Sequence, residues 1–188
     1  MKKVKGQIIT DIEFVSDLRC FTKGEKYNFQ PGINLLVGDQ GCGKSTLISS
    51  LVDCNEEIKV NVTRESDYTF FDTENHNPRM VKNLSSTFHN GANVLCSFFE
   101  SHGETLLPFL TGLKKFKNRL IFLDEPEAGL SIRSQYKVAE LLLHLAAKNG
   151  NQLFIATHSP IFMETVNDVL SLEHKKWMLT KDFINTQK

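Results

Sequence analysis

The sequence predicts an α/β fold in which a mainly parallel central sheet is joined by a small antiparallel portion near the N-terminus. Strand patterns separated by helical patterns run through most of the chain, which is typical of a parallel sheet with crossover helices. The first third is richer in strand patterns, which suggests the antiparallel portion. The length of 188 residues suits one domain, residues 1–188, because a domain typically has about 150 residues.

Six segments have strand character: residues 7–15, 25–30, 33–37, 67–72, 119–123 and 152–156. The first two partly alternate between apolar and polar side chains, as strands with one solvated face do. The third and fifth are mostly apolar, which favours buried strands. Pro31 and Gly32 mark a turn between the second and third segments.

Apolar residues at helical spacing predict helices over residues 45–52, 106–116 and 132–147. In the middle helix, Pro108 fits only in the first turn, because proline lacks the backbone donor that later turns need. The last helix ends at Lys148-Asn149-Gly150, and a glycine there is a common C-terminal signal. One face of this helix is apolar and consists of Val138, Leu141, Leu142, Leu145 and Ala146.

Composition excludes several classes of protein. Lysine plus arginine and aspartate plus glutamate both number 22, so the chain is not a globally basic nucleic-acid coat. No apolar run approaches the ~18 residues of a membrane span, and we expect no signal peptide. The four cysteines form no C-x-x-C pair, which argues against a zinc site and favours a reducing, cytoplasmic location.

A glycine-rich loop between the strand over 33–37 and the helix over 45–52 is the most specific motif. It matches G-x-x-x-x-G-K-[ST] in full. Glycines allow backbone N–H groups to surround phosphate oxygens, and the helix start adds its positive dipole end. Lys44 would neutralise the β- and γ-phosphates, and Ser45 would ligate Mg²⁺. The residues expected to bind nucleotide here are Gly38, Asp39, Gln40, Gly41, Cys42, Gly43, Lys44, Ser45 and Thr46.

An acidic pair follows the most apolar predicted strand. Asp124 and Glu125 come directly after Leu120-Ile121-Phe122-Leu123, so both lie at the carboxyl edge of the sheet, where the phosphate loop also lies. Asp124 would hold Mg²⁺ directly or through water. Glu125 would polarise an attacking water. The alternative is a solvated acidic turn before Pro126.

Residues 124–131, Asp-Glu-Pro-Glu-Ala-Gly-Leu-Ser, resemble the Walker B and D-loop stretch of ATP-binding-cassette (ABC) ATPases. They are most similar to the non-transporter branch, which includes chromosome-maintenance, recombination-repair and defence-associated ATPases. The resemblance implies a P-loop NTPase with an ABC-type head. It also implies that Glu125 is the catalytic base and that the D-loop contacts a partner subunit across a dimer interface.

Two further segments resemble motifs of the same family. Ala156-Thr157-His158-Ser159-Pro160 follows a predicted strand and is similar to the switch-histidine segment, so His158 would sense the γ-phosphate. Ser101-His102-Gly103-Glu104 resembles a degenerate signature motif. In the family this motif caps the γ-phosphate held by the other protomer, which would involve Ser101 and Gly103. The alternative is an ordinary helix cap.

The chain also departs from the family pattern. No clear Q-loop glutamine follows residues 67–72, although Glu74 or Asn75 could replace it. The D-loop ends in Ser131 rather than the more frequent aspartate, and no coiled-coil arm is present. The adenine-stacking residue stays open among four aromatic residues that are equally eligible for the core: Phe14, Phe21, Tyr27 and Phe29.

The resemblance implies an ATPase that uses ATP and Mg²⁺, forms a homodimer around two nucleotides and transmits its opening and closing to a partner. A nuclease, a DNA end or a toxin-like effector would fit the non-transporter branch. The alternatives are the nucleotide-binding subunit of a membrane transporter and a P-loop small-molecule kinase.

Several polar residues allow two interpretations. The basic runs over 114–119 and 174–177 could contact nucleic acid, but helix-end cations explain the first equally well. Arg64 and Arg79 could act as arginine fingers or simply be solvated. An electropositive loop would lower the pKa of the Cys42 thiol and permit redox control, whereas the alternative is a small filler residue.

Overall fold

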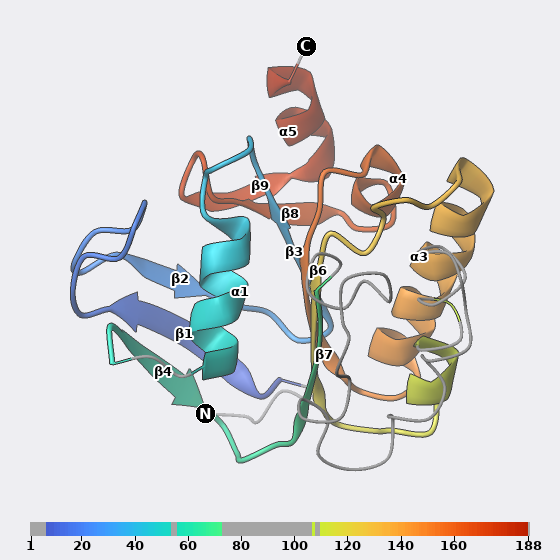
Figure 1. The fold of residues 1–188 in the computed structure, drawn as a ribbon, viewed down its shortest axis with the longest axis horizontal. Coiled ribbons are helices and arrows are strands. Elements are labelled where there is room, and N and C mark those ends of the chain that lie inside the picture. Colours follow the sequence, from blue (N-terminus) through green and yellow to red (C-terminus); the bar gives the residue numbers. More distant parts are fainter. Residues whose placement is uncertain (1–6, 54–55, 73–106, 108–109, 188) are drawn as a thin grey trace, which may run out of the picture.

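The computed structural model describes residues 7–53, 56–72, 107 and 110–187. In this part of the chain a central sheet has helices on both of its faces, and a smaller antiparallel sheet lies to one side of it (Figure 1). The antiparallel sheet has the order β2-β1-β4 and consists of β1 (Ile9–Phe14), β2 (Lys26–Asn28) and β4 (Ile58–Val62). The predicted antiparallel portion is therefore confirmed.

The central sheet has the order β5-β6-β7-β3-β8-β9 and is parallel except for β9. Its strands are β3 (Ile33–Val37), β5 (Tyr68–Asp72), β6 (Leu120–Asp124), β7 (Gln152–Ala156), β8 (Asp168–Ser171) and β9 (Lys176–Leu179). The helices are α1 (Lys44–Asp53), α3 (Ile132–Ala147), α4 (Pro160–Met163) and α5 (Thr180–Thr186).

The register of the central strands brings three loops to one edge of the sheet. Ala156, the last residue of β7, pairs with Leu36 of β3 on one side and with Asp124 of β6 on the other. Because these strands are parallel, the segments that follow β3, β6 and β7 all leave from the same carboxyl edge. The phosphate loop, the acidic pair and the predicted switch segment therefore start side by side.

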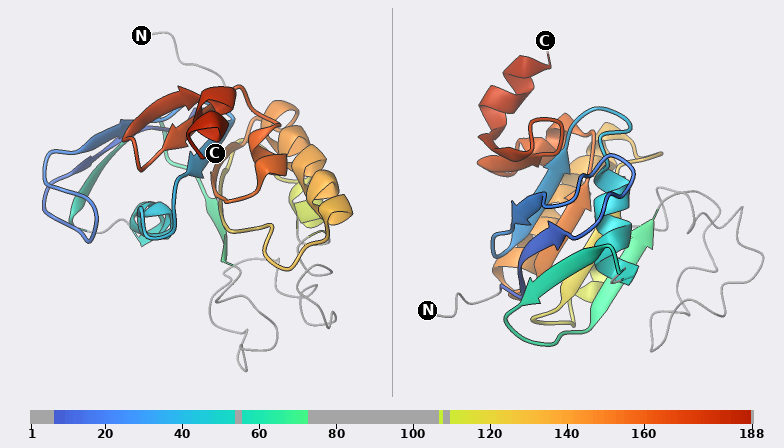
Figure 2. Two further views of the ribbon diagram at one scale, coloured as in Figure 1. Left: turned by 90° about the horizontal axis from the view of Figure 1, so that it is seen from above. Right: turned by 90° about the vertical axis from the view of Figure 1, so that its left-hand side faces the viewer.

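Side chains of the central strands alternate between two apolar cores. In β6, Ile121 and Leu123 face the core under α3, whereas Leu120 and Phe122 face the core that contains α1. This alternation explains why β6 is buried along its whole length. Figure 2 shows α1 between the antiparallel sheet and the central sheet, with α3 on the opposite side.

A buried glutamine ties the antiparallel region to the central sheet. The side-chain oxygen of Gln152, the first residue of β7, accepts hydrogen bonds from the backbone N–H groups of Ile8 and Ile9 at 2.9 and 2.8 Å. Its amide nitrogen donates to the carbonyls of Ile9 and Gln30. The fully buried side chain thus makes hydrogen bonds to four backbone groups of the antiparallel region and its connection to β3.

The observed elements follow the predicted pattern, with identifiable exceptions. The middle predicted helix is helical at residues 110–113 and turns at 114–115. Five short elements were not predicted because they carry little periodic pattern: β4, α4, β8, β9 and α5. Within the described residues, no helix is long and apolar enough to cross a membrane.

Candidate functional site

The phosphate loop connects β3 to α1 and depends on its glycines. Gly38, Gly41 and Gly43 all have positive φ, with values of 139°, 84° and 103°, which side chains rarely tolerate. At Gly43 a Cβ atom would also lie 2.8 Å from two ring atoms of Phe21. Only glycine fits there without moving the aromatic core, so the loop and that core constrain each other.

Lys44 is the first residue of α1, and its side chain turns back over the loop. Its Nζ donates hydrogen bonds to the carbonyl oxygens of Gly38 at 2.9 Å and Asp39 at 3.0 Å. The residue is only 5% exposed. The ammonium group therefore lies inside the loop, where phosphate oxygens would replace or join the two carbonyls as its partners.

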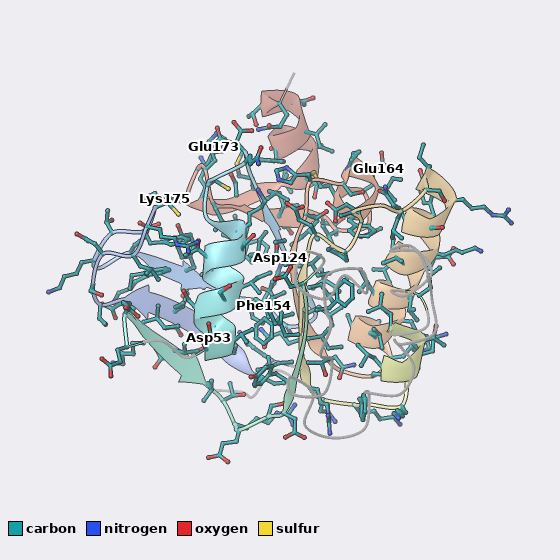
Figure 3. The ribbon with its side chains drawn as sticks, in the orientation of Figure 1. Asp53, Asp124, Phe154, Glu164, Glu173 and Lys175 are labelled. Carbon is teal, nitrogen blue, oxygen red and sulfur yellow. The ribbon has the colours of Figure 1, made fainter. Side chains whose placement is uncertain are left out.

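Ser45 and Asp124 lie together although 79 residues separate them in the chain. The Ser45 hydroxyl donates a hydrogen bond of 3.1 Å to Oδ1 of Asp124. Figure 3 shows Asp124 beside α1. A hydroxyl and a carboxylate are hard oxygen ligands, and Mg²⁺ binds such sites with few protein ligands and several waters. The two predicted metal ligands thus suit Mg²⁺ in chemistry and position.

Glu125 follows β6 with a backbone conformation that is unusual for a residue with a side chain. Its φ is +47°, and its N–H donates to the carbonyl of Ala156 at the end of β7. The side chain is 47% exposed and approaches His158, with 3.7 Å between Oε1 and Nε2. Backbone strain of this kind is concentrated at functional sites. The two predicted catalytic side chains thus lie next to each other, and both are partly exposed to solvent.

The remaining predicted nucleotide-binding and Q-loop residues lie partly at the phosphate loop and partly outside the described residues. Asp39, Gln40 and Gly41 are exposed at the tip of the phosphate loop. Thr46 accepts a hydrogen bond of 3.4 Å from Arg19 Nη1. Sequence reasoning missed Arg19, because a lone arginine in a loop carries no motif, yet it adds a cation beside the phosphate loop. Five residues lie outside the described part of the chain: Ser101, Gly103, Glu74, Asn75 and Arg79.

The four aromatic candidates for adenine stacking are all core residues. Phe14, Phe21, Tyr27 and Phe29 are buried. Phe14 and Phe21 stack on each other with ring centroids 4.2 Å apart. Their faces are occupied by neighbouring side chains, so none of the four offers a free surface to a base.

The interpretation of Cys42 as a thiol with a lowered pKa is wrong. Burial raises the pKa of the Cys42 thiol, and this effect outweighs the lowering by the neighbouring Lys44. The thiolate is therefore disfavoured at neutral pH. The geometry supports the alternative of a small filler, because Cys42 packs against the core that contains α1.

Some cations in and near the two basic segments make contacts within the chain. Arg119 pairs with Asp67 at 2.9 Å and lies over the Phe116 ring. Arg64 donates to the carbonyl of Asn118, just before β6, so it lies at the end of that strand opposite to Asp124. In the second run, Lys175 pairs with Glu25 at 2.9 Å.

Curated relatives include ATP-binding proteins of transport systems. The nickel import system ATP-binding protein NikD of Staphylococcus aureus (strain MRSA252) is 25% identical over 179 residues, which cover 71% of this chain and 69% of that protein. The lipoprotein-releasing system ATP-binding protein LolD of Neorickettsia sennetsu is 36% identical over 56 residues, which cover 30% of this chain and 25% of that protein.

Solved structures share the fold at low identity. The structure of cbiO1 from Clostridium perfringens, part of the ABC transporter complex cbiONQ, has a TM-score of 0.60 at 15% identity and covers 96% of this chain and 92% of its own. A dimeric ATP-binding cassette in a post-hydrolysis state, bound to ADP and Pi, has a TM-score of 0.54 at 13% identity, with 93% and 98% covered. The α/β fold is therefore that of ABC ATPases.

Family models identify the chain more directly. The family described as "AAA domain, putative AbiEii toxin, Type IV TA system" matches residues 55–164, and a second family described as "AAA domain" matches residues 15–83. The first match spans more than half of the chain and includes the acidic pair and the switch segment. The protein therefore belongs to this AAA-domain family of P-loop ATPases.

Proposed function

We propose that the protein is an MgATP-hydrolysing ABC-type ATPase that works as an ATP-driven dimerisation switch. One observation carries the proposal: Lys44, the Ser45–Asp124 pair and the facing side chains of Glu125 and His158 all lie at the carboxyl edge of β3, β6 and β7. This arrangement places phosphate binding, metal binding and water activation next to one another.

Each residue has a distinct part in the proposed reaction. Lys44 binds the β- and γ-phosphates, and Ser45 with Asp124 holds Mg²⁺, which supplies charge neutralisation on the phosphates. Glu125 takes the proton of the attacking water, because its carboxylate is half exposed and follows β6 at the same edge of the sheet as the phosphate loop. His158 lies beside Glu125 and contacts the γ-phosphate.

We propose a defence-related or DNA-related partner rather than a transporter. The description of the matching family, which includes a toxin, supports this, as does the departure of the signature stretch from the usual motif. The transporter alternative is supported by the relatives that serve nickel import and lipoprotein release. Recovery of a multispan membrane protein with the tagged chain would favour the transporter.

Light scattering after size exclusion tests the switch. Wild type and Glu125→Gln are measured with and without MgATP, and Glu140→Gln on the exposed face of α3 serves as the matched control. The expected result is an ATP-dependent dimer that persists in Glu125→Gln and dissociates with time in wild type and control. A monomer in every condition, despite demonstrated ATP binding, would refute the dimerisation switch.

A further inference from the structure

Glu127 is on the same loop as Glu125, and its side chain contacts the loop that carries His158. It belongs to the segment after β6, and its Oε1 accepts three hydrogen bonds from the segment after β7. The donors are the Thr157 hydroxyl at 2.6 Å, the His158 backbone N–H at 2.6 Å and the Ser159 backbone N–H at 3.1 Å. Hydrogen bonds to an ionised acceptor are about twice as strong as neutral ones.

The facing side chains of Glu125 and His158 do not hold each other in place. Their closest charged atoms are 3.7 Å apart, which is too long for a hydrogen bond. Both side chains are roughly half exposed, at 47% and 44%, so water competes for their polar atoms. The position of His158 therefore depends on the segment that carries it, and Glu127 binds the backbone of that segment.

The surroundings of Glu127 argue against the role of general base. Its Oε1 already accepts three hydrogen bonds, and its Oε2 is buried without a hydrogen-bond partner among the described residues. A base needs a lone pair within reach of the attacking water, and in this structure one oxygen is occupied and the other is shielded from solvent. A buried oxygen without a partner costs stability, so this carboxylate is a poor choice for stability alone.

The start of α3 strengthens the same link. Gln135 accepts a hydrogen bond of 2.7 Å from the Ser159 hydroxyl and donates one to the carbonyl of Leu130. Ser131 caps α3 by accepting from the Ser134 N–H. The segment that carries the predicted D-loop is therefore joined to the His158 segment through two side chains, Glu127 and Gln135.

We propose that Glu127 is a positioning residue that holds His158 opposite Glu125 for ATP hydrolysis. The catalytic part of this inference rests on the proposed function. The carboxylate fixes the backbone of residues 157–159 through Oε1, and the imidazole of His158 takes its direction from that backbone. Loss of the acceptor displaces His158 but leaves the phosphate-loop residues Lys44 and Ser45 in place, because they lie on α1.

The kinetic test compares two substitutions at this position. Glu127→Met keeps the length of the side chain but removes the acceptor, and a misplacement of about 1 Å at a catalytic group costs up to ~10²-fold in rate. We expect kcat to fall by ~10-fold or more with KM for ATP changed less than about 3-fold. Glu127→Gln keeps one acceptor oxygen and should recover most of kcat. Glu164→Gln, at the exposed end of α4 (Figure 3), is the control and should match wild type.

Two outcomes of this comparison would overturn the proposal. A Glu127→Gln variant as inactive as Glu127→Met would make Glu127 a base, since an amide still accepts hydrogen bonds but takes no proton. A Glu127→Met variant with wild-type kcat would show that the link has no effect on the reaction. A third check uses His158→Ala. Glu127→Met should cause no further loss of kcat in that background, because it acts through His158. If the two substitutions instead lower kcat independently, Glu127 does not act through His158.

Amide NMR spectra separate this inference from the proposed function. In Glu127→Met without nucleotide, the His158 and Ser159 amide resonances should move upfield and exchange faster, while Glu164→Gln leaves them unchanged. This result does not require that the protein hydrolyses ATP. Unchanged amide resonances of His158 and Ser159 would refute the proposal that Glu127 holds this segment. If Glu127→Met does not fold, Thr157→Val is the second variant, because it removes one donor to Glu127 Oε1 and one acceptor of the Ser159 N–H. It should lower kcat and move the Ser159 amide resonance upfield, and a variant with wild-type kcat and an unchanged Ser159 amide would refute the link.

Discussion

Replacing Lys44 with alanine removes the cation that lies inside the phosphate loop. In the structure its Nζ is bound to two carbonyl oxygens at 2.9 and 3.0 Å. A hydrogen bond to a charged group contributes about 1.5–3 kcal/mol, so contacts with two phosphate oxygens are worth about 3–6 kcal/mol. Giving up the two carbonyl contacts offsets part of this gain. The net loss in Lys44→Ala is about 3 kcal/mol, which raises Kd for ATP by ~10²-fold.

Calorimetric titration with MgATP measures this loss, and Lys44→Arg serves as the control that keeps the positive charge. Arginine should lose less affinity than alanine, although its planar group does not reproduce the ammonium geometry. Thermal unfolding of both variants shows whether the loop carbonyls of Gly38 and Asp39, left without their donor, destabilise the fold. A folded Lys44→Ala variant with Kd within about threefold of wild type would refute the placement of the β- and γ-phosphates at this lysine.

Four further outcomes are expected. Glu125→Gln should bind ATP normally but hydrolyse it ~10²-fold more slowly in a phosphate-release assay; near-normal turnover would place the base elsewhere. Ser101→Arg should hydrolyse poorly alone, as Lys44→Ala does, but mixing the two should restore part of the activity through one intact shared site; no recovery in a demonstrated heterodimer would argue against shared sites. Gln152→Leu leaves buried backbone groups without partners and should lower the free energy of unfolding by about 3 kcal/mol, or the Tm by roughly 6–12 °C; a Tm within about 2 °C of wild type would contradict this. Because burial raises its pKa, Cys42 should react with iodoacetamide at pH 7 more slowly than a free cysteine, whereas fast labelling would support the rejected interpretation.

Local motifs explain how much of the site was predictable. The phosphate loop and the acidic pair are contiguous in sequence, and their position follows from the strands that precede them, so Lys44, Ser45 and Asp124 were assigned without a structure. The three hydrogen bonds of Glu127 connect residues about 30 positions apart. No periodic pattern encodes such contacts, so the sequence places Glu127 in the D-loop stretch without revealing its link to the His158 segment.

Burial explains most of the remaining differences between sequence and structure. The same aromatic residue type can stack on adenine or fill a core, so the sequence leaves both roles open for Phe14 and Tyr27. Their burial in the structure assigns them to the core. The pKa of the Cys42 thiol depends on two opposing effects: burial raises it and the nearby Lys44 lowers it. The sequence shows only the nearby cation. Short elements such as β8 and β9 are defined by pairing with neighbours that a single chain segment does not reveal.

The position of β7 between β3 and β6 has a mechanical consequence. Its backbone is hydrogen-bonded along both sides, and all five of its residues are buried. Its amides should therefore exchange with solvent only when the whole sheet opens, whereas those in the segments after β6 and β7 can exchange through local opening. The strand cannot slide without breaking both ladders at once. The proposed switch therefore predicts that nucleotide-dependent motion is confined to the segments attached to the end of β7, with the sheet as the stationary frame.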